Sequence, residues 1–139
     1  MLKKNLKNIN LLKFKLKLIE LKIKLLGILI KILGLKKKKQ MENNETIEEM
    51  IRRIAKEEGV DPDLAVRVAL CESGLDPDAT RENPDGSVDR GLYQWNSYWH
   101  PEISDACAYT PECATRAFCK AVKDGNLHWW NSSRHCWER

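Results

Sequence analysis

The chain has 139 residues, of which 32% are charged, and its formal net charge is +4. This length suits one small domain, whose thin core would benefit from additional cross-links. The charge is divided unevenly: residues 1–40 hold thirteen lysines and one acid, whereas residues 41–139 hold eleven Lys or Arg and nineteen Asp or Glu. The division predicts a basic tail, 1–40, attached to an acidic domain, 41–139, which argues against nucleic acid as the main partner.

The tail consists almost entirely of Leu, Ile, Lys and Asn. Its longest uncharged central run, residues 25–30, is far shorter than the ~20 apolar residues of a membrane span, and no clear signal peptide is present. On a helix, one face would carry Lys13, Lys17, Glu20, Lys24 and Lys31, whereas Lys15 and Lys22 would fall on the opposite face. Residues 12–18 also alternate as a strand would. The tail therefore fits a cationic segment on an anionic membrane or cell wall, a targeting segment, or a disordered low-complexity segment. A translation start at Met41 would leave a 99-residue domain without it.

Two helices are expected next. Thr46 and Glu49 form the pattern of a capping box, and Ile47, Met50, Ile51, Ile54 and Ala55 follow at helical spacing up to Gly59. Asp61 and Pro62 predict the start of a second helix, which Gly74 should end. Glu72 then lies in the last turn of a buried helix.

The middle of the chain changes character. Residues 83–86, Asn-Pro-Asp-Gly, are a turn signal between short polar stretches and predict a small antiparallel hairpin within residues 78–91. Residues 91–99 are apolar and aromatic and should return to the core. Another helix is expected from Thr110-Pro111 to about Lys123, followed by a tryptophan-rich end that packs back on the domain. The predicted fold class is α+β, mainly helical.

Five cysteines lie in the acidic domain: Cys71, Cys107, Cys113, Cys119 and Cys136. The absence of a C-x-x-C pair argues against zinc, and we expect neither a metal nor a cofactor. Disulfides in an exported domain are the better interpretation. Two bridges among five cysteines allow about fifteen arrangements, between which the sequence does not choose. We expect Cys71–Cys136 and Cys107–Cys113, with Cys119 free.

Glu72 and Asp89 are the candidate catalytic residues. A carboxylate at a helix C-terminus faces the negative end of the helix dipole, and apolar neighbours also disfavour its charge, so the pKa of Glu72 should be raised as a general acid requires. Asp89 lies seventeen residues later on the predicted hairpin. Two carboxyls so arranged suit the cleavage of a glycosidic bond. The alternatives are an exposed glutamate that ends a helix and an aspartate that caps a turn.

Two segments carry a family resemblance. Glu72-Ser-Gly74 with residues 91–96, Gly-Leu-Tyr-Gln-Trp-Asn, resembles soluble lytic transglycosylases and goose-type lysozymes. Residues 83–97, Asn-Pro-Asp-Gly-Ser-Val-Asp-Arg-Gly-Leu-Tyr-Gln-Trp-Asn-Ser, resemble the corresponding segment of c-type lysozymes, and the interval between the catalytic Glu and Asp matches without a gap. The close resemblance covers residues 72–99. The cysteine layout departs from the c-type enzymes, so their disulfide pairing is not carried over.

The resemblance implies a lysozyme-like fold, with the hairpin beside an active-site cleft. It implies an enzyme that cuts the β-1,4 bond between N-acetylmuramic acid and N-acetylglucosamine in peptidoglycan. Glu72 would be the general acid and Asp89 the nucleophile or electrostatic stabiliser, which are the roles of the two carboxyls in lysozyme, the type case. Substrate-binding positions would be Asn83, Gln94, Asn96, Tyr98 and Trp99, whereas we expect Tyr93 and Trp95 to pack in the core.

Two other functions remain open from the sequence. A lytic transglycosylase would use Glu72 alone and form anhydro-muramic ends, and Gly74 follows that family's version of the motif. A non-catalytic glycan- or calcium-binding module on the same fold is the other alternative. For the enzyme we expect peptidoglycan glycan strands as the partner, action outside the cytoplasm, contact with an anionic membrane or wall through residues 1–40, and a monomer.

Overall fold

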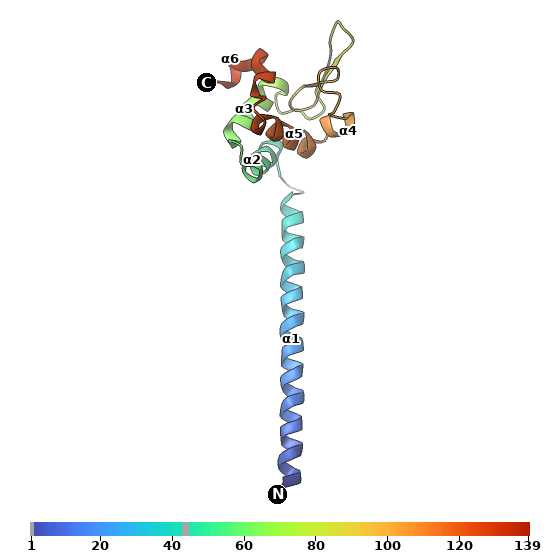
Figure 1. Cartoon of the computed structure of the whole chain (residues 1–139), viewed down its shortest axis with the longest axis vertical. Helices are drawn as coiled ribbons and strands as arrows, with labels where there is room; N and C mark the ends of the chain where they lie inside the picture. The colour runs from blue at the N-terminus through green and yellow to red at the C-terminus, as the bar shows by residue number, and fades with distance from the viewer. Residues whose placement is uncertain (1, 43–44) are drawn as a thin grey trace. The chain divides into compact units, whose positions relative to one another are not determined.

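The computed structural model describes residues 2–42 and 45–139 (Figure 1). The chain divides into two compact units, Met1–Asn44 and Glu45–Arg139. Met1, which begins the predicted tail, and Asn43 and Asn44 lie outside the described residues.

The first unit is a single helix, α1 (Leu2–Glu42). It includes Met41 and Glu42, which the sequence analysis assigned to the domain. The strand alternative for residues 12–18 is wrong, because these residues are helical. No helix in the described residues combines the length and the apolar content that a membrane crossing requires.

Helices α2 (Ile47–Glu58) and α3 (Pro62–Ser73) begin and end where local sequence signals place them. Thr46 and Glu49 form the full capping box on α2, and Asp61 caps α3 with Pro62 in its first turn. Both helices end at a glycine in the left-handed conformation, which residues with a Cβ atom rarely adopt. The end of α3 fixes the place of Glu72.

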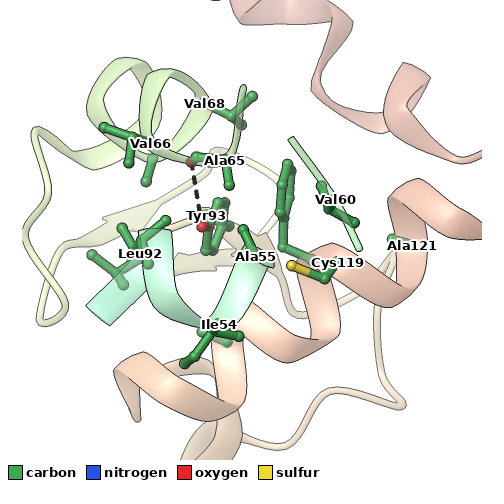
Figure 2. Packing of buried hydrophobic residues seen from close by; sticks show 14 of the residues in the cluster. Ile54, Ala55, Val60, Ala65, Val66, Val68, Leu92, Tyr93, Cys119 and Ala121 are labelled. Atoms are coloured by element: carbon green, nitrogen blue, oxygen red, sulfur yellow. Dashed lines mark hydrogen bonds between the residues drawn. The ribbon is translucent and has the colours of Figure 1, made fainter. Parts of the chain in front are cut away.

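The core of the second unit lies between α2, α3 and α5 (Pro111–Lys123). Tyr93 is fully buried at its centre, where its ring stacks on Phe118 with the centroids 4.3 Å apart. Its hydroxyl donates a hydrogen bond to the carbonyl oxygen of Ala65 on α3, as Figure 2 shows among the surrounding aliphatic side chains. Tyr93 thereby ties the segment after the hairpin to the helix that carries Glu72.

A three-stranded antiparallel sheet follows α3, with strands β1 (Thr80–Glu82), β2 (Val88–Arg90) and β3 (Trp95–Asn96) in that order. The first two strands are the predicted hairpin, whereas the sequence analysis did not predict β3 as a strand. Asp89 pairs with Arg81 on one side and with Asn96 on the other. Gly91 follows β2 with φ +68°, and a Cβ atom there would lie 2.0 Å from the carbonyl oxygen of Ala108. This close approach requires glycine.

The C-terminal part folds back on α3. The 3₁₀ helix η1 (Leu127–Ser133) and α6 (Arg134–Trp137) bury Trp130 and Trp137, and a short helix α4 (Asp105–Ala108) precedes α5. The structure contains the disulfides Cys71–Cys136 and Cys107–Cys113, while Cys119 is free and buried in the core. The first disulfide joins the end of α3 to α6. The second unit is therefore mainly helical with a small sheet, as expected for a lysozyme-like α+β fold.

Candidate active site

A cavity of about 790 Å³ in the Glu45–Arg139 unit is lined by both candidate carboxyls, Glu72 and Asp89. This volume lies within the usual range of ligand sites, about 300–1,000 Å³. Its wall comes from the end of α3, the sheet, the segment after β3 and the C-terminal turns. The other lining residues are Cys71, Arg81, Tyr93, Gln94, Trp95, Asn96, Trp99, His100, Trp129, Trp130, Ser132, Ser133, His135 and Cys136.

Glu72 is half-buried in the last turn of α3. Its pKa is raised above the ordinary value chiefly by burial, and the nearby charge of Asp89 adds to the increase. A hydrogen bond from Ser133 and the positive charge of Arg81 act in the opposite direction. A carboxyl whose charged form is disfavoured by burial can hold a proton for donation.

Ser133 is the direct hydrogen-bond partner of Glu72, since its Oγ donates to Glu72 Oε1 at 2.5 Å. The same oxygen accepts a hydrogen bond from Trp137 Nε1 at 3.1 Å and lies 3.1 Å from the carbonyl oxygen of Trp130. A hydroxyl has one hydrogen and can also accept. Ser133 can therefore donate to an ionised Glu72, or accept from a protonated Glu72 and donate to Trp130 instead.

Two amide side chains hold Asp89 in place. Asn96 Nδ2 donates to Asp89 Oδ1 at 2.8 Å, and Asn83 Nδ2 donates to Asp89 Oδ2 at 3.1 Å. The other end of the Asn96 amide is fixed as well, because its Oδ1 accepts hydrogen bonds from the backbone N–H groups of Tyr98 and Trp99. Both carboxylate oxygens of Asp89 thus have donors of fixed direction.

Ser87, in the turn between β1 and β2, connects these two amides. Its buried hydroxyl donates to Asp85 at 2.7 Å and accepts from Asn96 Nδ2 at 2.9 Å and from Asn83 Nδ2 at 3.2 Å. Because the serine proton is used on Asp85, its lone pairs remain for the two amides. The turn of the hairpin therefore orients the donors of Asp89.

Two motif residues hold the scaffold of the site together. Ser73 Oγ lies 3.0 Å from the carbonyl oxygen of Ala69 and 2.9 Å from that of Leu92, and its single hydrogen can be donated to Leu92, which links α3 to the segment after β2. Gln94 lines the cavity, but its Nε2 donates to the carbonyl oxygens of Ala79 and Gly91 at 3.2 and 2.9 Å. The amide nitrogen of Gln94 therefore has a structural role, whatever its amide oxygen binds.

Aromatic side chains form the remaining wall. Trp99 is 78% exposed at the cavity, whereas Trp95 is only 2% exposed and packs edge-to-face on His100, Trp129 and Trp130. Trp95 Nε1 is a buried donor without a hydrogen-bond partner in the described part of the chain. The exposed face of Trp99 suits stacking against a flat apolar surface, such as one face of a sugar ring.

The predicted binding residues divide into three groups by position. Gln94, Asn96 and Trp99 line the cavity, and Asn83 lies behind it as a hydrogen-bond partner of Asp89. Tyr98 does not line the cavity, and its side chain is 60% exposed. Its hydroxyl lies beside Gly86 in the hairpin turn, 3.1 Å from where a Cβ atom on that glycine would be. In the described residues no group of three or more His, Cys, Asp or Glu side chains is arranged to hold a metal.

Four further residues that line the cavity were not predicted from the sequence: Arg81, Trp129, Ser133 and His135. Arg81 could have been found from the predicted hairpin, because the strand register places it opposite Asp89. Ser133 could have been found from the expected Cys71–Cys136 disulfide. That bond joins the residue before Glu72 to the residue three positions after Ser133.

A family model described as a lysozyme-like domain matches residues 52–132, more than half of the chain. The match includes Glu72, Asp89, Ser87 and Asn96 and reaches almost to Ser133. No curated protein gives a significant match.

Proposed function

Since this chain belongs to the lysozyme-like domain family, we propose that it is a glycosidase that cleaves the glycan strands of peptidoglycan. In this proposal the bond cut is the β-1,4 bond between N-acetylmuramic acid and N-acetylglucosamine. The observation that carries the proposal is the unequal pair of carboxyls in one cavity. Glu72 is half-buried with a raised pKa, while Asp89 accepts hydrogen bonds on both oxygens.

Glu72 acts as the general acid. Its raised pKa keeps a larger fraction of it protonated near neutral pH than an exposed glutamate would have. The proton passes to the glycosidic oxygen as the bond to the sugar breaks. The division of roles between two carboxyls follows that of lysozyme, the type case.

Asp89 stabilises the positive charge that develops on the sugar, or attacks the sugar carbon to form a covalent intermediate. Asn83 and Asn96 hold its carboxylate in one orientation throughout. Water then completes the hydrolysis, with Glu72 now taking up a proton. Both disulfides and the family assignment support action outside the cytoplasm.

A second candidate is a lytic transglycosylase, which the Glu72-Ser73-Gly74 motif favours. In that reaction the sugar's own hydroxyl closes an anhydro ring, so that Asp89 is not required. The hydrogen bonds from Asn83 and Asn96 to Asp89 favour the hydrolase, because they hold a second carboxylate in a fixed orientation in which it can act on the substrate.

The test is the release of soluble fragments from purified peptidoglycan by the full chain. Glu72→Gln should reduce the rate by at least about 100-fold, because general acid catalysis typically contributes 10²–10⁴-fold. Glu82→Gln is the matched control, since Glu82 is an exposed carboxyl on β1 that does not line the cavity. An inactive wild-type chain with the native fold would overturn the proposal, and full activity in Glu72→Gln would remove Glu72 from it.

A further inference from the structure

Helix α1 carries two separate rows of exposed apolar side chains. Each row repeats at alternating steps of three and four residues, which is the heptad spacing of a coiled-coil seam. The first, which we call the Ile9–Leu33 row, consists of Ile9, Leu12, Leu16, Ile19, Ile23, Leu26, Ile30 and Leu33. The second, the Leu11–Leu35 row, consists of Leu11, Phe14, Leu18, Leu21, Leu25, Ile28, Ile32 and Leu35.

The two rows lie on nearly opposite faces of the helix. They are offset by two residues, and each residue of an α-helix turns the chain by about 100°. Lysines occupy the strips between the rows, and no lysine interrupts either row. In water such a helix leaves large apolar surfaces exposed on both sides, and exposed surfaces of this size are typical of binding sites for another protein or a membrane.

The Ile9–Leu33 row has the composition of a parallel two-stranded coiled coil. Its first core positions hold isoleucine in three of four heptads, and its second core positions hold leucine in three of four. Isoleucine at the first position with leucine at the second is the combination that favours two parallel strands. A strict seven-residue repeat also predicts a left-handed supercoil.

The charges beside the Ile9–Leu33 row specify the orientation of the two helices. In a parallel pair the residue directly before a first core position meets the residue five positions later in the other helix. Lys15 then meets Glu20, the only acid among residues 1–40, and no two lysines meet. If the same residues paired in an antiparallel arrangement, Glu20 would lie near Glu20 of the other helix and Lys22 near Lys22 of the other helix, so that like charges would meet.

The Leu11–Leu35 row lacks this complementarity. The same five-residue pairing would place Lys17 against Lys22 and Lys31 against Lys36. Like charges beside a coiled-coil core oppose association. Charge therefore selects the Ile9–Leu33 row as the one that a second copy of this chain covers.

We propose that two copies of the chain pair through the Ile9–Leu33 row as a parallel coiled coil of four heptads. The pair spans roughly 37 Å, at about 1.5 Å per residue. This inference replaces the expectation of a monomer and does not depend on the proposed enzymatic activity. Each dimer would then carry two Glu45–Arg139 units, each with its own cavity.

Sedimentation equilibrium of the full chain at micromolar concentration tests the proposal. The wild-type chain should show twice the 16.1 kDa of one chain. Leu16→Lys with Ile23→Lys, two changes in the Ile9–Leu33 row, should give single chains. Leu18→Lys with Leu25→Lys is the matched control in the other row and should remain a dimer.

A charge exchange tests the parallel orientation. Lys15→Glu alone should raise the dissociation constant by roughly three- to tenfold, because it places two acids together in each pairing. Adding Glu20→Lys should restore it, since the ion pair is then re-formed with reversed charges.

Two results would overturn the proposal. One is equal dissociation by the two pairs of lysine substitutions. The other is a wild-type chain that remains single in solution, which would mean that the apolar rows of α1 bind something other than a second copy of the chain. Binding of that single chain to phosphatidylglycerol vesicles but not to phosphatidylcholine vesicles would identify an anionic membrane.

Discussion

Glu72 has to release a proton and take one up within each catalytic cycle of the proposed reaction, and Ser133 can serve it in both states. The hydroxyl donates to the ionised carboxylate, and it can turn toward the carbonyl oxygen of Trp130 when Glu72 is protonated. Trp137 Nε1 holds the serine oxygen in place in either case. Ser133 can therefore keep its hydrogen bond with Glu72 in both protonation states of the carboxyl.

Ser133→Ala should move the alkaline limb of the pH profile of kcat/KM to higher pH. The hydrogen bond from Ser133 lowers the pKa of Glu72, so its removal raises that pKa and keeps the general acid protonated in more alkaline solution. Activity at the optimum should fall by no more than about tenfold, the value of one hydrogen bond. Ser132→Ala is the control, and an unmoved limb in Ser133→Ala would refute the effect on Glu72.

Glu72→Gln should stabilise the fold at neutral pH. Burial raises the pKa of Glu72 in the folded state, so the folded protein binds more protons than the unfolded chain between the ordinary pKa and the raised one. Stability therefore falls as pH rises through that window and stays lower above it. Thermal unfolding at pH 7 should show a higher Tm for the variant, and the difference should disappear below the ordinary glutamate pKa. A lower Tm at pH 7 would contradict this account.

At the scale of elements, the sequence predicted the helices and turns that depend on interactions between residues close together in the chain. The capping box at Thr46, the glycines that end α2 and α3, and the turn at residues 83–86 each act within a few residues of chain. They predicted the positions of both carboxyls because Glu72 and Asp89 sit on those elements. Helix α4, strand β3 and the contact of Ser133 with Glu72 depend on packing between distant segments, which periodicity does not reveal.

The disulfide Cys71–Cys136 should matter more than Cys107–Cys113, both for stability and for activity. It closes a loop with a sequence separation of 65, against 6 for the other. Chain entropy then predicts losses of about 4 and about 2 kcal/mol when each pair is replaced by serines, measured by urea unfolding. Because Cys71–Cys136 also holds the C-terminal turns beside Glu72, its loss should lower the rate of wall cleavage even in folded protein. Equal losses of stability and of cleavage rate in the two variants would contradict the greater importance of Cys71–Cys136.

At the scale of the whole molecule, charge is separated along the chain. Residues 1–40 carry +12 and residues 41–139 carry −8. An acidic unit is repelled by an anionic cell wall, whereas a lysine-rich helix is attracted to it. We therefore propose that the first unit attaches the protein to the wall and that the second unit carries out the proposed cleavage.

Removal of residues 1–40 should weaken binding to purified cell walls, most strongly at low ionic strength. The Debye length is about 30 Å at 0.01 M salt and about 8 Å at 0.15 M, so salt screens the attraction of the tail. Co-sedimentation with walls at both salt concentrations measures the effect. Equal binding by the full and shortened chains at low salt would show that the tail does not attach the enzyme.

The identity of the sugar ends formed from peptidoglycan tests the central claim most directly. The full chain would digest purified peptidoglycan in water enriched in ¹⁸O, and mass spectrometry would identify the new ends. A hydrolase with two working carboxyls should form reducing muramic ends that carry one ¹⁸O, and both Glu72→Gln and Asp89→Asn should abolish them. Anhydro-muramic ends without ¹⁸O, formed equally well by Asp89→Asn, would contradict the hydrolase and leave Asp89 with a structural role.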